Sequence, residues 1–287
     1  MNVMRRWKRT ICTAVAVMAG SMCLAASPAD IYKEAAETMA AHPDGEYVIR
    51  INMQMPMIGA ADIVNTVDLQ AEPFIVNSKT TITGLGKTTE PTQAYVEQDG
   101  DKLNVYYGKT SNGKTEWRKT SQKLNSTTPI SQEFNANHDV LAGVKSIAAA
   151  GDNAYTVVYD AKKLYQDTDK ANLKKAGCTP EQIDMITQVL QSLQQSGDIS
   201  AVVTVDPVSN RISRVRVSLT PQMRSIAMSL LDQYQTTEAN KAIVKQFIQF
   251  SEIDMTVDCT ALPEGTALTV PQSIKKQAVS VKEKAKR

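Results

Sequence analysis

The chain has 287 residues, 42% of them hydrophobic and 22% charged, and its formal net charge is +2. The basic residues gather at the two ends, because residues 1–26 contain four basic and no acidic residues, and residues 275–287 contain six basic residues and one acidic residue. Of the 32 basic and 30 acidic residues, the body between these ends therefore keeps 22 and 29. This acidic body argues against nucleic-acid binding, which needs a concentrated basic surface.

Residues 1–26 have the pattern of a secretory signal peptide. Positive side chains come first, an apolar run over residues 11–17 follows, and small residues end the segment at Ala25 and Ala26. The run is shorter than the roughly 20 residues that span a bilayer, which favours a cleaved signal over a membrane anchor. The sequence therefore predicts export to the periplasm or cell envelope, with cleavage after Ala26.

The cysteines raise two questions about the exported chain. Cys23 follows the apolar run as the cysteine of a lipoprotein would, but Met22 stands where lipoprotein processing needs a small residue. We therefore expect a soluble product. Cys178 and Cys259 are the only cysteines that remain after cleavage, so one disulfide can form at most, and the sequence leaves its formation open.

Four Ser-Pro or Thr-Pro dipeptides predict helix starts, because the hydroxyl caps the first turn and proline fits the first helical position. They begin at Ser27, Thr128, Thr179 and Thr220. The first predicted helix ends near residues 42–45. Further helices are expected over residues 139–149 and 221–234.

The strongest helix signal covers residues 179–197. Gln182 completes a capping box with Thr179, and Gly197 ends the segment. Apolar residues at helical spacing form one face, which should pack against the rest of the protein. They are Ile183, Ile186, Val189, Leu190 and Leu193.

Alternating apolar residues predict about ten strands between these helices. Residues 46–57, 62–71 and 74–83 read as a meander, and Asp99-Gly100 and Asn112-Gly113 read as hairpin turns. A later hairpin joins residues 199–206 to 211–220, and a final strand covers 250–257. Arg216 and Ser218 alternate with apolar residues, so one face of the sheet should meet water.

These elements indicate an α+β fold with an extensive antiparallel sheet. No Gly- or Ser-rich linker and no internal repeat divides the chain, so we predict one domain over residues 27–274. Residues 275–287 form a basic tail after it. The tail is either a solvated terminus or a peripheral contact with an anionic membrane surface.

The sequence lacks the motifs of common catalytic chemistry. It has no nucleophile elbow, phosphate-binding glycine loop, zinc-protease helix or dinucleotide fingerprint. His42 and His138 are interpreted as lone surface or capping residues. Residues 167–172 lack the glycine and the terminal glutamate of a calcium loop. We therefore predict no catalytic residue, no metal, no cofactor and no enzymatic activity.

The stretch INMQMPM, residues 51–57, has a period of two that places Ile51, Met53, Met55 and Met57 on one face of a strand. Three interpretations stay open. The methionines are ordinary core, or they line an apolar cavity that adapts to its contents, or their sulfurs bind Cu(I). Copper is the weakest interpretation, because a methionine-only site lacks the usual His or Cys.

Several segments resemble, in their order along the chain, the DUF6612 family of bacterial envelope proteins, which is similar to the broader LolA-like group of lipoprotein and lipid carriers. The segments are SPADIYKEAAETMA, INMQMPM, VEQDGDKLNVYYG with TEWRK, VVTVDPVSNRISRVRVSL and VPQSIKKQA. The resemblance covers nearly the whole chain after residue 26. It implies a strongly curved antiparallel β half-barrel with helices packed on its concave side around an apolar cavity.

The function implied by this resemblance is a carrier or chaperone that binds a lipid or an acylated protein without catalysis. The cavity would be lined by the methionine row and by one face of the helix over residues 179–197. The candidate lining residues are Ile51, Met53, Met55, Met57, Ile186, Leu190 and Leu193. The alternative is a non-enzymatic interaction or sensor module of the envelope with a filled core.

Overall fold

The computed structural model describes residues 27–56, 59–84, 86–124, 141–165, 179–231, 237–263 and 265–280. Its helices are α2 (Pro28–Ala41), α4 (Ala161–Leu164), α6 (Pro180–Gln195), α7 (Thr220–Leu231), α8 (Glu238–Phe250) and α9 (Gln272–Gln277). Its strands are β1 (Gly45–Met55), β2 (Gly59–Gln70), β3 (Ile75–Gly84), β4 (Lys87–Thr88), β5 (Thr92–Asp99), β6 (Lys102–Ser111), β7 (Lys114–Lys123), β8 (Val144–Gly151), β9 (Ala154–Tyr159), β10 (Ile199–Asp206), β11 (Arg211–Ser218), β12 (Glu252–Thr260) and β13 (Val279–Ser280).

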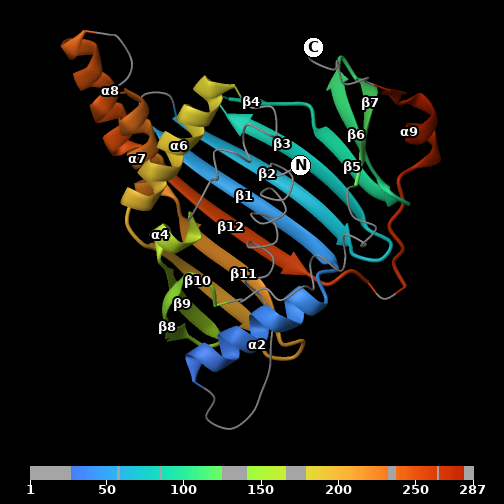
Figure 1. Cartoon of the computed structure of the whole chain (residues 1–287), viewed down its shortest axis with the longest axis horizontal. Helices are drawn as coiled ribbons and strands as arrows, with labels where there is room; N and C mark the ends of the chain where they lie inside the picture. Colours follow the sequence, from blue (N-terminus) through green and yellow to red (C-terminus); the bar gives the residue numbers. More distant parts are fainter. Residues whose placement is uncertain are drawn as a thin grey trace. The chain divides into compact units, whose positions relative to one another are not determined.

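The strands form one mostly antiparallel, unclosed sheet, which confirms the predicted α+β class (Figure 1). The hydrogen-bonded order is β13-β7-β6-β5-β3-β2-β1-β12-β11-β10-β9-β8, with β4 pairing only β3. The short β13 runs parallel to β7. No helix among the described residues is long and apolar enough to cross a membrane.

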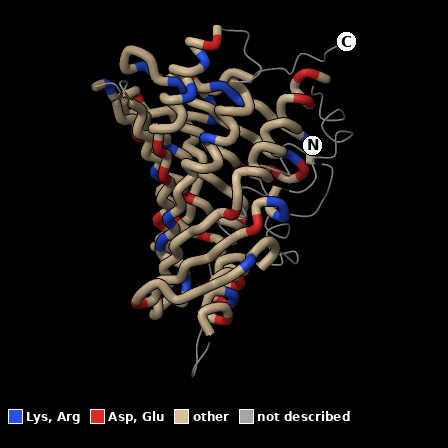
Figure 2. The backbone as a smooth tube through the Cα atoms, turned by 90° about the vertical axis from the view of Figure 1, so that its left-hand side faces the viewer, with Lys and Arg blue, Asp and Glu red and all other residues tan. Residues whose placement is uncertain are grey.

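The fold divides into two compact units. The first unit comprises Met1–Ala40, Asn52–Ala60 and His138–Thr256, and the second unit comprises Ala41–Ile51, Ala61–Asn137 and Val257–Arg287. Each unit is described by itself below. Figure 2 shows that basic and acidic residues are interspersed along the described backbone.

In the first unit, the sheet buries one face and leaves the other in water, as the sequence predicts. Strand β10 alternates buried and exposed or half-buried residues throughout, so Val203 is fully buried while Val202 beside it is 39% exposed. Helix α2 lies across strands β9–β11 (Figure 1), and its Tyr32 hydroxyl bonds to the Tyr159 hydroxyl at 2.7 Å. The fully buried positions of α2 are Tyr32, Ala35, Ala36 and Met39, which is the spacing of one helix face.

Two of the four predicted helix caps, Ser27 and Thr179, are confirmed. Thr179 and Gln182 form a reciprocal capping box, with N to O distances of 3.3 Å and 2.9 Å, and Gly197 follows α6 with a φ of 91°. Asp30 donates its N–H to the Ser27 hydroxyl at the start of α2. Thr220 is different, because its hydroxyl accepts the Ile253 N–H at 2.8 Å and so ties α7 to β12. Thr128 lies outside the described residues.

The helix predicted over residues 139–149 is wrong where the structure describes it. Residues 144–151 form β8, which pairs antiparallel with β9. The alanines of this segment favour a helix by local propensity. The turn at Asp152-Asn153, with a φ of 54° at Asn153, closes a hairpin instead, and pairing with β9 overrides the local preference.

Helix α8 was not predicted, and a strand was expected to begin at Phe250. The helix extends to Phe250, and the strand β12 begins only at Glu252. Thr237 caps α8 by accepting the Asn240 N–H at 3.3 Å. The cap lacks both the following proline and the glutamate or glutamine of a capping box, which explains why the pattern was overlooked.

The second unit consists mainly of the hairpins that the sequence predicts. Asn112 and Gly113 form a two-residue turn between Ser111 and Lys114, with φ values of 53° and 72°, as a tight hairpin requires. Gly108 is needed for packing, since a Cβ there would lie 2.7 Å from the Trp117 ring.

The segment before residue 281 packs onto this hairpin sheet. Val270 and Ile274 join Tyr106 and Trp117 in a buried cluster. Lys275, placed in the predicted tail, belongs to α9, and its ammonium donates to Glu97 at 2.5 Å. The tail residues from 281 onward lie outside the described residues.

Candidate functional site

The methionine row lies on β1 between the buried core and the surface. Ile51, Met53 and Met55 are all half-buried, while Gln54 between the two methionines is exposed. The fully buried Met39 of α2 shows the contrast with a true core methionine. Met57 lies outside the described residues. The row therefore leaves part of its apolar surface uncovered.

The predicted residues of α6 are also half-buried, although they form its apolar stripe. This stripe comprises Ile186, Leu190 and Leu193. Helix α7 binds a different side of α6, where the Gln188 amide donates to the Ser229 hydroxyl at 3.0 Å. The Ser225 hydroxyl of α7 likewise donates to the Ser192 carbonyl at 2.8 Å.

At 3.6 residues per turn, the contacts with α7 lie about 150° around the helix from the centre of the apolar stripe. An amphipathic helix normally buries its apolar side against its neighbour. The two hydrogen bonds to α7 use the Gln188 side chain and the Ser192 backbone carbonyl, so they lie on the side of α6 away from the stripe.

Two apolar residues on β12 extend the pattern and were missed from the sequence. Ile253 and Met255 are half-buried within the first unit, and β12 is the neighbour of β1 in the sheet. They alternate with Asp254 and Thr256, which is the same period-two signal as in the methionine row. That signal could have identified Met255 as a further flexible thioether beside Met53 and Met55.

A separate apolar row crosses four strands of the second unit. The strand register pairs Leu69 with Val76, Val76 with Val96, and Val96 with Val105. The three valines are half-buried, and next to them Tyr107 is 46% exposed. Because side chains alternate along a strand, this row lies on the face opposite Tyr106, against which the α9 segment packs.

The sequence could not reveal this row, because it depends on the register between strands. A one-residue slip would place each valine on the other face. Each strand alone shows only a short alternation of apolar and polar residues.

The described residues hold no cluster of three or more His, Cys, Asp or Glu that could bind a metal ion. His42 is exposed just after α2, and His138 lies outside the described residues. Cys259 is half-buried on β12, whereas Cys178 lies outside the described residues, so the disulfide stays a prediction.

The strongest pKa perturbations belong to structural tyrosines. Burial raises the pKa of Tyr159 to about 12, and burial next to Tyr159 raises the pKa of Tyr32 well above its usual value. Both residues join α2 to β9. Burial and the hydrogen bond to Glu97 likewise raise the pKa of Tyr106, which belongs to the α9 cluster.

Comparison with known proteins adds no assignment. The chain matches no protein-family model, and a search of curated proteins finds no significant match. The resemblance to the DUF6612 family therefore stays a prediction.

Proposed function

We propose that this is an exported cell-envelope protein that binds a hydrophobic ligand, a lipid or an acyl chain, and acts as a carrier or chaperone without catalysis. The proposal includes the signal peptide over residues 1–26 and the LolA-like half-barrel, with helices on its concave side. The observation that carries it is the apolar stripe of α6, which stays half-buried while the polar side of the helix packs on α7.

The fold leaves part of the apolar surface of the α6 stripe exposed. Complete burial of a Leu or Ile side chain contributes about 1.5–3 kcal/mol, so a stripe of three half-buried residues forgoes part of that stabilisation. A hydrophobic ligand laid against Ile186, Leu190 and Leu193 would recover it. This gives the ligand a source of affinity that does not need a polar binding group.

The methionines suit a ligand of variable shape. Their side chains are unbranched and flexible, and so they conform to different acyl chains. Met53 and Met55 on β1, together with Met255 on β12, supply three thioethers on neighbouring strands of the first unit. Half-burial supports the cavity-lining interpretation of the row over ordinary core.

The row in the second unit offers a length estimate for an acyl chain. Leu69 is buried, so the accessible part of the row is the three half-buried valines on β3, β5 and β6, which span about 10 Å at about 4.8 Å per strand. A carbon chain with bonds of about 1.5 Å and tetrahedral angles advances about 1.25 Å per carbon, so these residues match about eight carbons. Burying seven methylenes contributes about 6 kcal/mol before the costs of immobilising the chain.

The test is native mass spectrometry with lipid extraction on residues 27–287 secreted by a bacterial host. We expect co-purified lipid at a defined stoichiometry, which a fluorescent fatty acid displaces. Leu190→Gln and Met55→Gln should each weaken fatty-acid binding by about five- to thirtyfold if each removes about 1–2 kcal/mol of apolar contact. Val208→Gln is the matched control, because Val208 is 92% exposed in the turn after β10.

The variant Val96→Gln tests, in the same assay, whether the ligand binds to the first or to the second unit. Loss of binding in that variant alone would assign the ligand to the row of the second unit. An apo mass without binding of the fatty acid would overturn the proposal and favour an interaction or sensor module with a filled core.

A further inference from the structure

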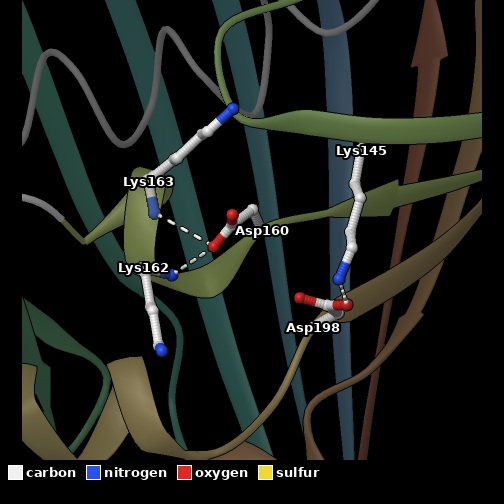
Figure 3. A network of polar contacts seen from close by, with 5 residues as sticks. All are labelled: Lys145, Asp160, Lys162, Lys163 and Asp198. Atoms are coloured by element: carbon white, nitrogen blue, oxygen red, sulfur yellow. Dashed lines mark hydrogen bonds and ion pairs between the residues drawn. The ribbon is translucent and has the colours of Figure 1, made fainter.

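The first unit contains a cavity, lined mostly by charged and amide residues, that the proposed lipid function does not use. Its volume is about 420 Å³, in the lower part of the range for small-molecule sites. It lies among the start of β8, the end of β9, α4 and the end of α6 (Figure 3). The lining residues are Lys145, Asp160, Ala161, Lys162, Gln194, Gln195, Gly197 and Asp198.

Existing contacts hold three of the four charged groups in the cavity. Lys145 donates to Asp198 at 2.6 Å, and this bond and the attraction of Asp198 raise the pKa of Lys145. Asp160 caps α4 by accepting the backbone N–H groups of Lys162 and Lys163 at 2.9 Å and 3.3 Å through one oxygen, Oδ1.

Lys162 is the fourth charged group. Its side chain lines the cavity, whereas the side chain of Lys163 points in the opposite direction (Figure 3). Within the part of the chain that the structure describes, the Lys162 ammonium has no hydrogen bond or ion pair. It is thus available to a carboxylate, while the Asp160 Oδ2 atom remains available to a cation.

We propose that this cavity binds a small zwitterion that carries one carboxylate and one ammonium group, as an amino acid or a dipeptide does. Lys162 binds the ligand carboxylate, and Asp160 binds the ligand ammonium. Gln195 and Gln194 add neutral amide groups around them, although the Gln194 amide nitrogen already donates one N–H to the Tyr165 carbonyl at 3.0 Å. A ligand with a single charge would leave one of the two opposite charges of the cavity without a partner.

The exposure of the cavity determines the strength of this binding. The Lys145 side chain is 59% exposed and that of Asp198 is 38% exposed, so water and salt screen the charges. Binding should therefore be weak and should weaken further as ionic strength rises.

The test is backbone-amide NMR titration of residues 27–287 with glycylglycine as the probe. We expect saturable shifts at residues 194–198. N-acetylglycylglycine, which lacks the ammonium, and glycylglycine amide, which lacks the carboxylate, should each bind at least fivefold more weakly. Binding of all three probes with equal affinity, or no saturable shift with any of them, would overturn the proposal.

Two variants and a control assign the roles. Lys162→Gln should weaken the binding of glycylglycine at least fivefold. Asp160→Asn should weaken it equally while it keeps the cap of α4, because asparagine also caps helices. Lys163→Gln should leave the affinity unchanged. An equal loss from Lys163→Gln and Lys162→Gln would contradict the assignment, and thermal unfolding confirms that each variant is folded. Fatty-acid binding does not enter this test.

Discussion

Replacement of Lys275 by methionine removes an ammonium group from the α9 cluster while it keeps most of the side-chain volume. The Lys275 ammonium donates to the Glu97 carboxylate at 2.5 Å, with side-chain exposures of 32% for Lys275 and 12% for Glu97. Tyr106, itself buried, donates its hydroxyl to the other oxygen of Glu97 at 2.9 Å. The variant therefore leaves a nearly buried carboxylate with its cationic partner removed.

The expected cost follows from these exposures. Removal of one partner from a fully buried ion pair costs about 3–5 kcal/mol. Water reaches about a third of Lys275, so screening reduces the expected loss in free energy of unfolding to about 1–3 kcal/mol. Glu97→Gln should cost less, about 1 kcal/mol, because glutamine still accepts from Tyr106 and the partly hydrated ammonium tolerates the loss of its partner.

Urea unfolding followed by tryptophan fluorescence measures this effect. Trp117 is the only tryptophan of residues 27–287, and it packs in the same cluster as Ile274. Lys276→Met is the matched control, because Lys276 is the next residue of α9 and is exposed. A loss below about 0.5 kcal/mol for Lys275→Met, equal to that of the control, would refute the ion pair as a stabilising contact. The ion pair would also be refuted if the double variant Lys275→Met and Glu97→Gln lost as much free energy of unfolding as the two single variants combined.

Three further predictions concern packing and pH. Gly108→Ala should destabilise the protein by about 1–3 kcal/mol, because the new Cβ would lie 2.7 Å from the Trp117 ring; unchanged Trp117 fluorescence and stability would contradict this. Tyr32→Phe should lower the free energy of unfolding by about 1–2 kcal/mol, because the buried Tyr159 hydroxyl loses its partner at 2.7 Å. In thermal unfolding, the double variant with Tyr159→Phe should lose less stability than the two single variants combined. Additive losses would count against the hydrogen bond. Because burial raises the pKa of Tyr159 to about 12 from an unfolded value of about 10, its stabilisation is fully present below pH 10 and declines as the pH rises through 12. Thermal unfolding between pH 9 and about 12 should show this decline in the native chain and a smaller one in the double phenylalanine variant, whereas identical profiles would exclude the tyrosine pair as its cause.

Local sequence signals predicted most elements whose boundaries depend on a few neighbouring residues. The capping box at Thr179, the turn at Asn112-Gly113 and the alternation of β10 each have a short-range physical cause. A cap satisfies amides within one turn, and a tight hairpin needs φ values that Asn and Gly adopt readily. Such features are legible without knowledge of the rest of the chain.

The failures have a different origin, because they depend on which partner a segment finds. The alanines of residues 144–151 prefer a helix in isolation, but β9 offers a strand to pair with and a turn that closes the hairpin. The valine row of the second unit requires the register of four strands, which no single strand contains. Tertiary pairing decided both outcomes.

Helix α6 shows how this limit applies to the candidate site. Its sequence predicts an amphipathic helix, and the natural expectation is that the apolar stripe meets the neighbouring helix. The hydrogen bonds to α7 come from Gln188 and from the Ser192 backbone carbonyl on the other side of the helix, and Leu190 is half-buried. A hydrophobic pattern identifies the surface that seeks a partner, but only the structure shows which partner the fold supplies. For α6 the fold leaves apolar area uncovered, and this uncovered area is the reason to look for a ligand there.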